Sequence, residues 1–445
     1  MARTSDAVVT GPILPYLLRQ SLVLFVGMAS LTALSLVDAW FVGQLGTEAL
    51  VAIGFTTPIF LVGMNALLSL GTGITAVLAR HIGEQKSGEI AQVSATSLWS
   101  GGILGTLLGM TGWLGHSVWF GAMGATGEVA ELLRPYMTWI YVGMCLIGGL
   151  VGLISIIRSF GDSIWPGIIM LVIMLVNLGL DPVLMFGWGP APEMGLSGAA
   201  LATVISLGIG NVLGLIRLEH WLPWRSWVSA FLQPNGRGLS AILAITLPSA
   251  FTRVLLPLST AIVTGLLAGY GDAIVAAYGL SFRADILLLM FMVALSSVLA
   301  PFVGQNAGAN QGSRLRKGLR LGMFLAVGYG LTLTLVMGIR GRTFGSWFTD
   351  SKAVLDQMQR YFWLVPWGYA LNGCLLIATS TLNALHQPLK ATAVVITHLL
   401  VSYLPLAWLG NHLGSSDWIF LAYPLSQIPA LGLSLWLMGR EVRKI

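Results

Sequence analysis

The feature that most constrains this chain is a succession of long apolar runs. A membrane-spanning helix needs about 20 mostly apolar residues to cross a hydrocarbon layer about 30 Å thick. Twelve such runs lie between polar, Gly or Pro breaks. Their approximate limits are 14–43, 50–80, 92–115, 132–158, 164–187, 194–217, 238–268, 273–303, 315–340, 355–382, 388–410 and 416–438. We therefore predict an all-α polytopic membrane protein with twelve transmembrane helices.

Composition supports this reading. Only 9% of the 445 residues are charged, 56% are hydrophobic, and the mean hydropathy is +0.83. A soluble domain has roughly 25% charged residues, so this chain has too few to cover a water-facing surface. A transmembrane β-barrel would instead show alternating segments of about 10 residues. Cys145 and Cys374 lie inside apolar runs, and we expect small core side chains there rather than a disulfide.

The basic residues predict the orientation. With twelve spans, sixteen of the 23 Lys and Arg residues fall on the side that holds both termini, and five fall on the other side. Basic residues concentrate in cytoplasmic loops, so we expect cytoplasmic termini in a bacterial inner membrane. This bias also accounts for the net charge of +6 without a nucleic-acid partner. No small-residue cleavage site follows the first apolar run, so that span itself is expected to direct insertion.

The chain also repeats itself. The segment "GEVAELLRPYM" (127–137) resembles "KAVLDQMQRYF" (352–362) at an offset of 225 residues. We predict an N-terminal six-helix lobe at 1–217, a cytoplasmic linker at 218–237 and a C-terminal six-helix lobe at 238–445. Parallel repeats of this kind are typical of transporters that build two bundles with a cavity between them.

Motifs for enzyme chemistry are missing. The sequence contains no Gly-Lys dipeptide, so it has no phosphate-binding loop and is not expected to hydrolyse ATP. "GTGITA" (71–76) matches a dinucleotide fingerprint, but no strand precedes it, and we interpret it as helix packing. There is no HExxH and no Cys/His metal cluster. His398 is a lone intramembrane histidine, which we interpret as a packing residue. We expect neither an enzyme nor a bound cofactor.

Two carboxylates within the apolar runs of the first lobe need a reason, because an acid in lipid costs about 3 kcal/mol or more. Asp38 lies near the end of the first run. Asn177 and Asp181 are four residues apart, hence on one face of the fifth span, and Pro182 favours a bend there. Two poorly hydrated carboxylates cannot both ionise cheaply, so such a pair holds a proton or Na⁺. The Asn177 amide can donate to an ionised carboxylate and accept from a protonated one.

Other intramembrane polar residues lie elsewhere. Arg253 is in the seventh span, and Arg283 and Asp285 begin the eighth. Arg283 and Asp285 are two residues apart and do not share a helix face, so each could pair with another span. A buried Arg253 would repel a cationic compound unless a group such as Asp285 neutralised it. We assign these three residues, with Asn65 of the second span, to a substrate cavity.

At these residues the chain resembles the multidrug and toxic compound extrusion (MATE) transporters. The similarity covers nearly the whole chain and rests on the order and spacing of several segments. These are "VDAWFVGQLGTEALVAIGF" (37–55), "RSFGDSIWP" (158–166), "NLGLDPVLMFGWGPAPEMGLSGAALATV" (177–204), "APFVGQNAGANQ" (300–311) and "LNALHQPLKAT" (382–392).

The resemblance implies an antiporter with two six-helix lobes that expels amphipathic, mostly cationic compounds in exchange for H⁺ or Na⁺. In the DinF-like branch, Asp38 and Asp181 would bind the coupling ion, with Asn177, Tyr136 and Thr203 in the surrounding network. Another branch carries an acid in the seventh span, where this chain has Arg253, and that departure favours the DinF-like branch.

Several alternatives stay open at this level. Na⁺ can replace H⁺ at Asp38, Asp181 and Asn177, although a proton needs fewer ligands. Arg253 and Arg283 would also suit a flippase for a lipid or lipid-linked precursor. The expected partners are small amphipathic substrates and membrane lipids, with no nucleic acid, and we expect a monomer.

Overall fold

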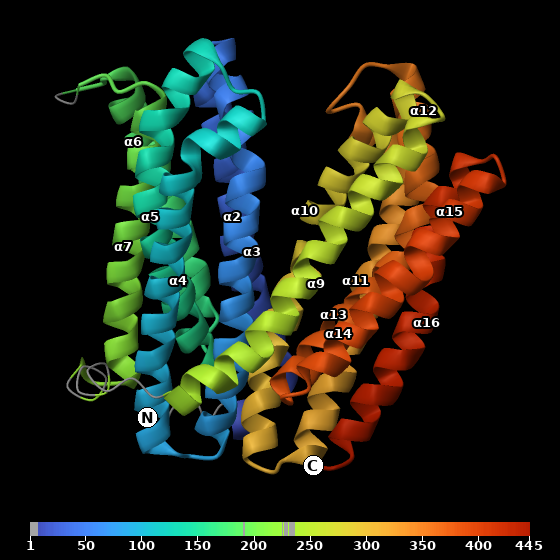
Figure 1. Ribbon diagram of the computed structural model, residues 1–445. Helices are drawn as coiled ribbons and strands as arrows, with labels where there is room; N and C mark the ends of the chain where they lie inside the picture. Colours follow the sequence, from blue (N-terminus) through green and yellow to red (C-terminus); the bar gives the residue numbers. More distant parts are fainter. Residues whose placement is uncertain (1–7, 190–191, 225, 227–229, 231–235) are drawn as a thin grey trace. The chain divides into compact units, whose positions relative to one another are not determined.

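The computed structural model describes residues 8–189, 192–224, 226, 230 and 236–445, and within this range the chain is helical without a β-strand (Figure 1). The first half contains α2 (Ile13–Gln44), α3 (Thr47–Gly83), α4 (Ser87–Ala122), α5 (Gly127–Ser159), α6 (Ile164–Phe186) and α7 (Leu196–Trp221). The second half contains α9 (Gly236–Ala268), α10 (Asp272–Gly308), α11 (Gly312–Gly345), α12 (Lys352–Leu364), η1 (Val365–Gly368), α13 (Tyr369–Ala384), α14 (Pro388–Ile396), η2 (Thr397–Tyr403), α15 (Leu404–His412) and α16 (Ser416–Val442).

These helices match the predicted spans closely. Eleven helical segments of the described chain are long and apolar enough to cross a membrane. Two of them are composite, Lys352–Ala384 and Pro388–His412. The remaining predicted span, 92–115, corresponds to α4, whose many Gly and Ser residues lower its mean hydropathy. The helices extend a few residues beyond most predicted limits, because helical hydrogen bonding continues into the polar ends that an apolar-run criterion excludes.

Contacts within the chain group into two compact units. The first unit comprises Leu22–Thr246, and the second comprises residues 8–21 with Leu247–Ile445. The contacts therefore divide the chain inside α2 and α9, whereas the sequence prediction divided it at 218–237. Within that predicted linker, residues 218–221 complete α7 and residues 236–237 begin α9. Positions 225, 227–229 and 231–235 of the linker lie outside the described residues.

The internal repeat is visible in the backbone of the turns between helices. Residues with left-handed backbone dihedral angles recur 225 positions apart, as Gly46 (φ 122°) and Gly271 (φ 105°), Gln85 (φ 56°) and Asn310 (φ 54°), and Gly161 (φ 86°) and His386 (φ 59°). A side chain disfavours this conformation, so its recurrence at a fixed offset is a structural signature rather than coincidence. The predicted parallel repeat is therefore present in the backbone.

Irregular helix marks the second unit. The last but one span changes from α14 to the π-helix η2 and then to α15. Pi-helical turns are rare and occur frequently at functional sites. The same unit includes the N-terminal segment, where the Arg314 guanidinium on α11 donates to the carbonyl oxygens of Val8 (3.0 Å) and Gly11. Arg314 therefore fixes the chain just before α2.

Candidate functional site

The predicted acid pair is brought together inside the first unit. Asp38 comes from α2, six residues before that helix ends, and Asp181 comes from α6. Asp181 is fully buried, Asp38 is half-buried, and their carboxyl groups lie within hydrogen-bonding distance of one another. Asp181 is not a helix-end residue, because α6 continues to Phe186 and stops at Gly187, which is left-handed.

Asn177 bridges the two acids. With its amide nitrogen turned toward the carboxylates, Asn177 donates to Asp181 Oδ2 (3.0 Å) and to Asp38 Oδ1 (3.2 Å). Its oxygen then faces the backbone N–H of Thr203 on α7 (3.1 Å). The reverse orientation would set two N–H donors against each other at Thr203, so the hydrogen-bond network selects the first orientation. The chain thus fixes one amide between three helices.

Tyr136 and Thr203 lie near the acid pair and Asn177. Thr203 Oγ1 lies 3.2 Å from the Asn177 amide oxygen and 3.1 Å from the Ala199 carbonyl oxygen, and either oxygen can accept its single hydrogen. Tyr136, on α5, is close enough to Asp38 and Asp181 to feel the charge of either. Its ring packs with an apolar cluster to which all six helices from α2 to α7 contribute. The five residues predicted to bind the coupling ion therefore form one site.

A glycine contact holds the two acidic helices together. Gly27 of α2 packs on Gly167 of α6 so tightly that a Cβ on Gly27 would lie 2.6 Å from the Gly167 Cα. Small residues allow helix backbones to approach this closely within a membrane. Pro182 follows Asp181 and cannot donate to the helix ladder, which leaves a weak point in α6 beside the acid. The site thus combines one rigid contact with one point of weakened helix.

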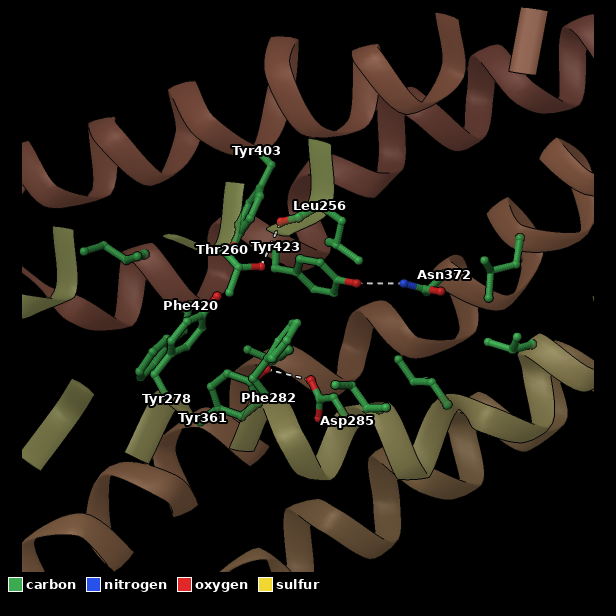
Figure 2. A pocket seen from close by; sticks show the side chains of 16 residues that line it. Leu256, Thr260, Tyr278, Phe282, Asp285, Tyr361, Asn372, Tyr403, Phe420 and Tyr423 are labelled. Atoms are coloured by element: carbon green, nitrogen blue, oxygen red, sulfur yellow. Dashed lines mark hydrogen bonds between the residues drawn. The ribbon is translucent and has the colours of Figure 1, made fainter. Parts of the chain in front are cut away.

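The second unit contains its own buried acid. Asp285 on α10 is 7% exposed and accepts a hydrogen bond from the hydroxyl group of Tyr361 (2.6 Å; Figure 2). It also accepts a hydrogen bond from the hydroxyl group of Tyr369. No hydrogen bond or ion pair among the described residues joins Asp285 to Arg253. The hypothesis that Asp285 neutralises Arg253 was therefore wrong, because two tyrosines supply the donors instead.

The other residues assigned to a substrate cavity are divided between the two units. Arg253 on α9 is half-buried, and its Nε has no hydrogen-bond partner. Arg283 is exposed, and Asn65 lies half-buried on α3 of the first unit. His398 packs its ring 5.7 Å from that of Tyr423, but its Nε2 has no partner. The assignments of Arg253, Arg283 and Asn65 stay predictions.

Sequence reasoning missed a group of tyrosines. Five of the ten tyrosines of the chain gather near Asp285. They are Tyr278, Tyr361, Tyr369, Tyr403 and Tyr423. Tyr361 was recoverable from the repeat, because it lies 225 residues after Tyr136. The other four come from α10, α13, η2 and α16, which no sequence spacing connects.

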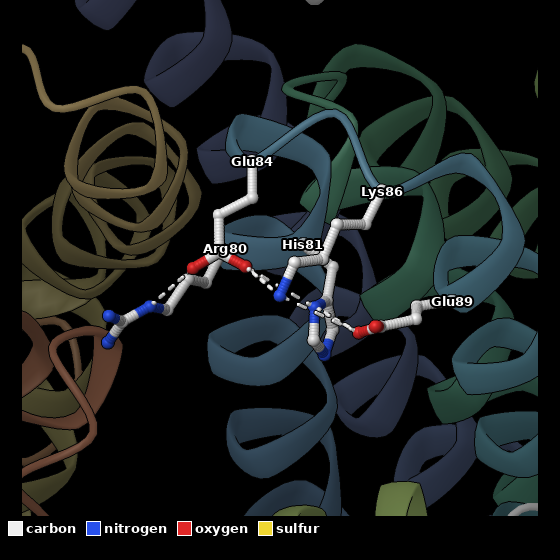
Figure 3. Close-up of polar contacts among 5 residues, drawn as sticks. All are labelled: Arg80, His81, Glu84, Lys86 and Glu89. Atoms are coloured by element: carbon white, nitrogen blue, oxygen red, sulfur yellow. Dashed lines mark hydrogen bonds and ion pairs between the residues drawn. The ribbon is translucent and has the colours of Figure 1, made fainter.

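A charged cluster closes the turn between α3 and α4 (Figure 3). Glu84 pairs with Arg80 (3.0 Å) and Lys86 (2.9 Å), and His81 Nδ1 lies 3.2 Å from Glu89. Burial alone would raise the pKa of Glu84, but hydrogen bonds from Lys86 and Arg80 outweigh it and hold that pKa below its ordinary value. The cluster lies at a helix–helix turn outside the acid pair, and we interpret it as structural.

Comparison with known proteins also divides the chain into two matching halves. The MatE family model matches residues 24–183 and again residues 248–409. The chain belongs to the MatE family of membrane transporters. The two matches coincide with the repeat seen at the turns, and members of this family are transporters rather than enzymes. The DinF-like branch stays a prediction.

Similar proteins extend over the whole chain. A FAD transporter of Shewanella oneidensis is 30% identical over 97% of this chain and 96% of its own length. The probable multidrug resistance protein YoeA of Bacillus subtilis is 25% identical over 83% of this chain and 80% of its own. The bent form of the Vibrio cholerae MATE transporter VcmN is 28% identical, covers 99% of both chains and has a TM-score of 0.91. These matches confirm the fold of twelve transmembrane helices in two lobes and a transport function.

Proposed function

We propose that this chain is a secondary active antiporter that exports amphipathic, mostly cationic compounds in exchange for H⁺. The observation that carries the proposal is the buried contact between Asp38 and Asp181, bridged by Asn177. The multidrug relatives support export of varied compounds. The basic-residue bias supports a bacterial inner membrane with cytoplasmic termini, and we expect a monomer.

The acid pair supplies a charge switch. Two adjacent carboxylates in a poorly hydrated site share one proton more easily than they both ionise. Arrival of a further proton neutralises the pair. A protonated carboxyl group also carries an O–H donor, so the hydrogen bonds that Asn177 donates to the two acids are weakened. Because Asp38 and Asp181 belong to different helices, this change alters the attraction between α2 and α6. Loading the site therefore favours a different packing of α2.

The direction of exchange follows from charge. An ionised pair attracts an organic cation, and a protonated pair releases it. Inward proton movement gains about 2.3 kcal/mol per 100 mV of membrane potential for each charge. A carrier that alternates between these two states uses that gain to move the substrate outward.

The Asn177 orientation favours H⁺ over Na⁺. A sodium ion is bound by oxygen ligands, and the amide nitrogen of Asn177 points at both carboxylates. Turning the amide oxygen inward would set the nitrogen against the Thr203 N–H. A proton shared between Asp38 and Asp181 needs no such change. This argument supports proton coupling and leaves sodium to direct test.

A second substrate class has a specific observation behind it. The FAD transporter of Shewanella oneidensis matches 97% of this chain. FAD is a planar aromatic anion, and the buried Arg253 Nε without a partner would suit a negative group. FAD export is therefore the second candidate for the same antiport mechanism.

The test is transport in proteoliposomes under separately imposed pH and sodium gradients. Uptake of ethidium and of FAD would be followed side by side. We expect a pH gradient alone to drive ethidium, and Asp38→Asn to reduce that flux at least tenfold. Glu84→Gln is the matched control, because it removes an acid outside the pair. Undiminished proton-driven flux in Asp38→Asn would overturn the coupling role, and a response to sodium alone would replace H⁺ with Na⁺.

A further inference from the structure

An open hollow lies between the start of α11 and the segment that leads into α2. Its volume is about 780 Å³, and its walls are residues 9–15 and the first turns of α11. Both walls belong to the second unit. The predicted spans 14–43 and 315–340 begin at these walls, so the hollow lies at the depth where lipid headgroups meet the hydrocarbon layer.

One wall of the hollow is basic. Arg314 and Lys317 line it, and Arg320 lies one turn further along α11. Lys317, Arg320 and the neighbouring Arg316 are exposed. No ion pair among the described residues joins any of these four cations to an acid. Arg316 and Arg320 are four residues apart, where like charges on a helix repel each other, so a bound anion would stabilise this part of α11.

The internal repeat shows that this charge is particular to the second unit. In the first unit, the basic residues of the equivalent turn, Arg80 and Lys86, pair with Glu84. The preference of basic residues for one side of the membrane explains cations at both turns. It does not explain four cations without an acidic partner on one helix. The positions 225 residues before these four cations are Glu89, Ala91, Gln92 and Ala95.

Arg314 is held in place by groups that leave its charge uncompensated. Its Nε and Nη2 donate to the Val8 carbonyl oxygen at 3.1 and 3.0 Å, and its guanidinium carbon lies 5.7 Å from the centroid of the Phe302 ring. Carbonyl oxygens and a ring are neutral, so the positive charge remains at the wall. Lys317 lies three residues later and therefore on the same face of α11. The hollow thus presents two cations, one of which is fixed.

The rest of the lining is largely apolar. Ile13, Leu14 and Pro15 contribute from the start of α2, and Leu321 contributes from α11. Leu14 is 40% exposed. A soluble phosphate compound would use the basic wall alone, whereas a phospholipid carries both a phosphate and an apolar chain. Basic pockets beside transmembrane helices at the cytoplasmic surface bind the headgroups of anionic lipids.

We propose that this hollow is a binding site for an anionic phospholipid. The phosphate lies against Arg314 and Lys317, and the acyl chain begins over Leu14 and Leu321. The occupant is a membrane lipid rather than an exported compound, so this binding depends neither on the Asp38–Asp181 pair nor on the proposed antiport.

The experiment counts lipids bound to the purified full chain in detergent by native mass spectrometry. The probe is dioctanoyl phosphatidylglycerol, and the matched zwitterionic lipid is dioctanoyl phosphatidylcholine. We expect the wild-type chain to bind the anionic lipid at least about fivefold more tightly, because each cation near a membrane surface attracts anionic lipid by about that factor. Equal affinities for the two lipids would overturn the proposal. Displacement of the lipid by an equal concentration of glycerol 3-phosphate would do so too, because the occupant would then be a soluble phosphate.

Variants locate the site. Lys317→Gln should weaken binding of phosphatidylglycerol about fivefold and leave phosphatidylcholine unchanged. Arg440→Gln is the matched control, because it removes an exposed cation of α16 that does not line the hollow. Equal losses in these two variants would indicate a diffuse basic surface and contradict the assignment.

A third variant tests the hollow without changing its charge. Ser313 is exposed and lines the hollow, so Ser313→Phe places a ring in that space and keeps every cation. We expect it to weaken binding of phosphatidylglycerol at least as much as Lys317→Gln. Wild-type affinity in Ser313→Phe would show that the lipid does not enter the hollow.

Discussion

The two units share a backbone plan but place their acids differently. Left-handed turn residues recur 225 positions apart, and Tyr136 of the first unit has Tyr361 as its counterpart. Each of these tyrosines lies near a buried acid, Tyr136 beside Asp38 and Asp181, and Tyr361 on Asp285. The tyrosine position is therefore common to both units, although the acids are not.

The acids do not follow the repeat. The counterpart of Asp38 is Val263, which is buried in the apolar core of the second unit. Asp285 in turn corresponds to Phe60. Duplication thus preserved helices, turns and one aromatic position, whereas each unit acquired ionisable groups on different helices. Two similar bundles therefore hold different acidic groups, a bridged carboxylate pair in the first unit and a single acid beside an aromatic cavity in the second.

The turns differ in charge as well. Glu84, Lys86 and Glu89 of the α3–α4 turn correspond to Ala309, Gln311 and Arg314 in the second unit. The first turn is closed by its own ion pairs, whereas Arg314 binds the carbonyl groups that precede α2. The same backbone turn is therefore stabilised locally in one unit and by a distant segment in the other.

The largest difference between the two units is expected from isosteric changes of Asp38 and Asp285. Asp38→Asn should remove the response of flux to an imposed pH gradient. Asp285→Asn should keep that response and raise the half-saturating concentration of an aromatic cation about tenfold, because only a counter-charge is lost. Flux in proteoliposomes at several substrate concentrations separates the two. Identical defects in both variants would break the division of roles between the units.

A second effect concerns the bridge in the first unit. Asn177→Leu removes the donor shared by Asp38 and Asp181, and hydrogen bonds to charged groups contribute about 1.5–3 kcal/mol. We expect proton-driven flux to fall roughly tenfold or more. Asn211→Leu is the matched control, because Asn211 bonds backbone carbonyls away from the acids. A larger loss in the control would show that packing, not the acid pair, limits transport.

The equivalent tyrosines should differ in their contribution to stability. Tyr361→Phe leaves Asp285 with one tyrosine donor in place of two, and we expect a loss of about 1.5–3 kcal/mol. Tyr136→Phe should lose less, because among the described residues the Tyr136 hydroxyl makes no hydrogen bond to either acid. Apparent melting temperatures of the purified proteins test the order. The reverse order would indicate that Tyr136 is the more strongly bonded hydroxyl.

The smallest effect belongs to the charged turn. The folded state holds the pKa of Glu84 below its ordinary value of about 4.5. Its stabilisation is therefore complete above that value and is lost as the pH falls through the lowered pKa. We expect Glu84→Gln to destabilise the protein by less than about 1 kcal/mol near neutral pH and not at all in strong acid, because the side chains of Arg80 and Lys86 are about half exposed. Melting curves across acid pH test this, and a pH-independent loss would argue for packing instead.

Much of the fold could be predicted because lipid restricts the choices. Apolar runs of sufficient length have to be helices, so the twelve predicted spans fall on the observed helices within a few residues. Asp38, Asn177 and Asp181 could be selected because polar groups in lipid are costly. Their hydrogen bonds could not be read from the sequence, because they depend on how α2, α6 and α7 pack.

The second unit shows where sequence reasoning ends. Tyrosine is ordinary in an apolar helix, so Tyr278, Tyr403 and Tyr423 gave no signal until packing brought them together. The predicted pairing of Asp285 with Arg253 failed because charge alone suggests a cation as partner, whereas two hydroxyl groups serve equally well as donors. The sequence did not indicate the π-helix either, because one extra residue per turn does not change the apolar pattern of the span.

The contact between Gly27 and Gly167 has a mechanical consequence for the acid pair. It lies eleven residues before Asp38, or about 16 Å along α2. Because neither backbone can come closer at this point, the contact sets the separation of α2 and α6 one end of the helix away from Asp38. A methyl group added at Gly27 would push α2 and α6 apart and so separate the two acids without contacting either of them.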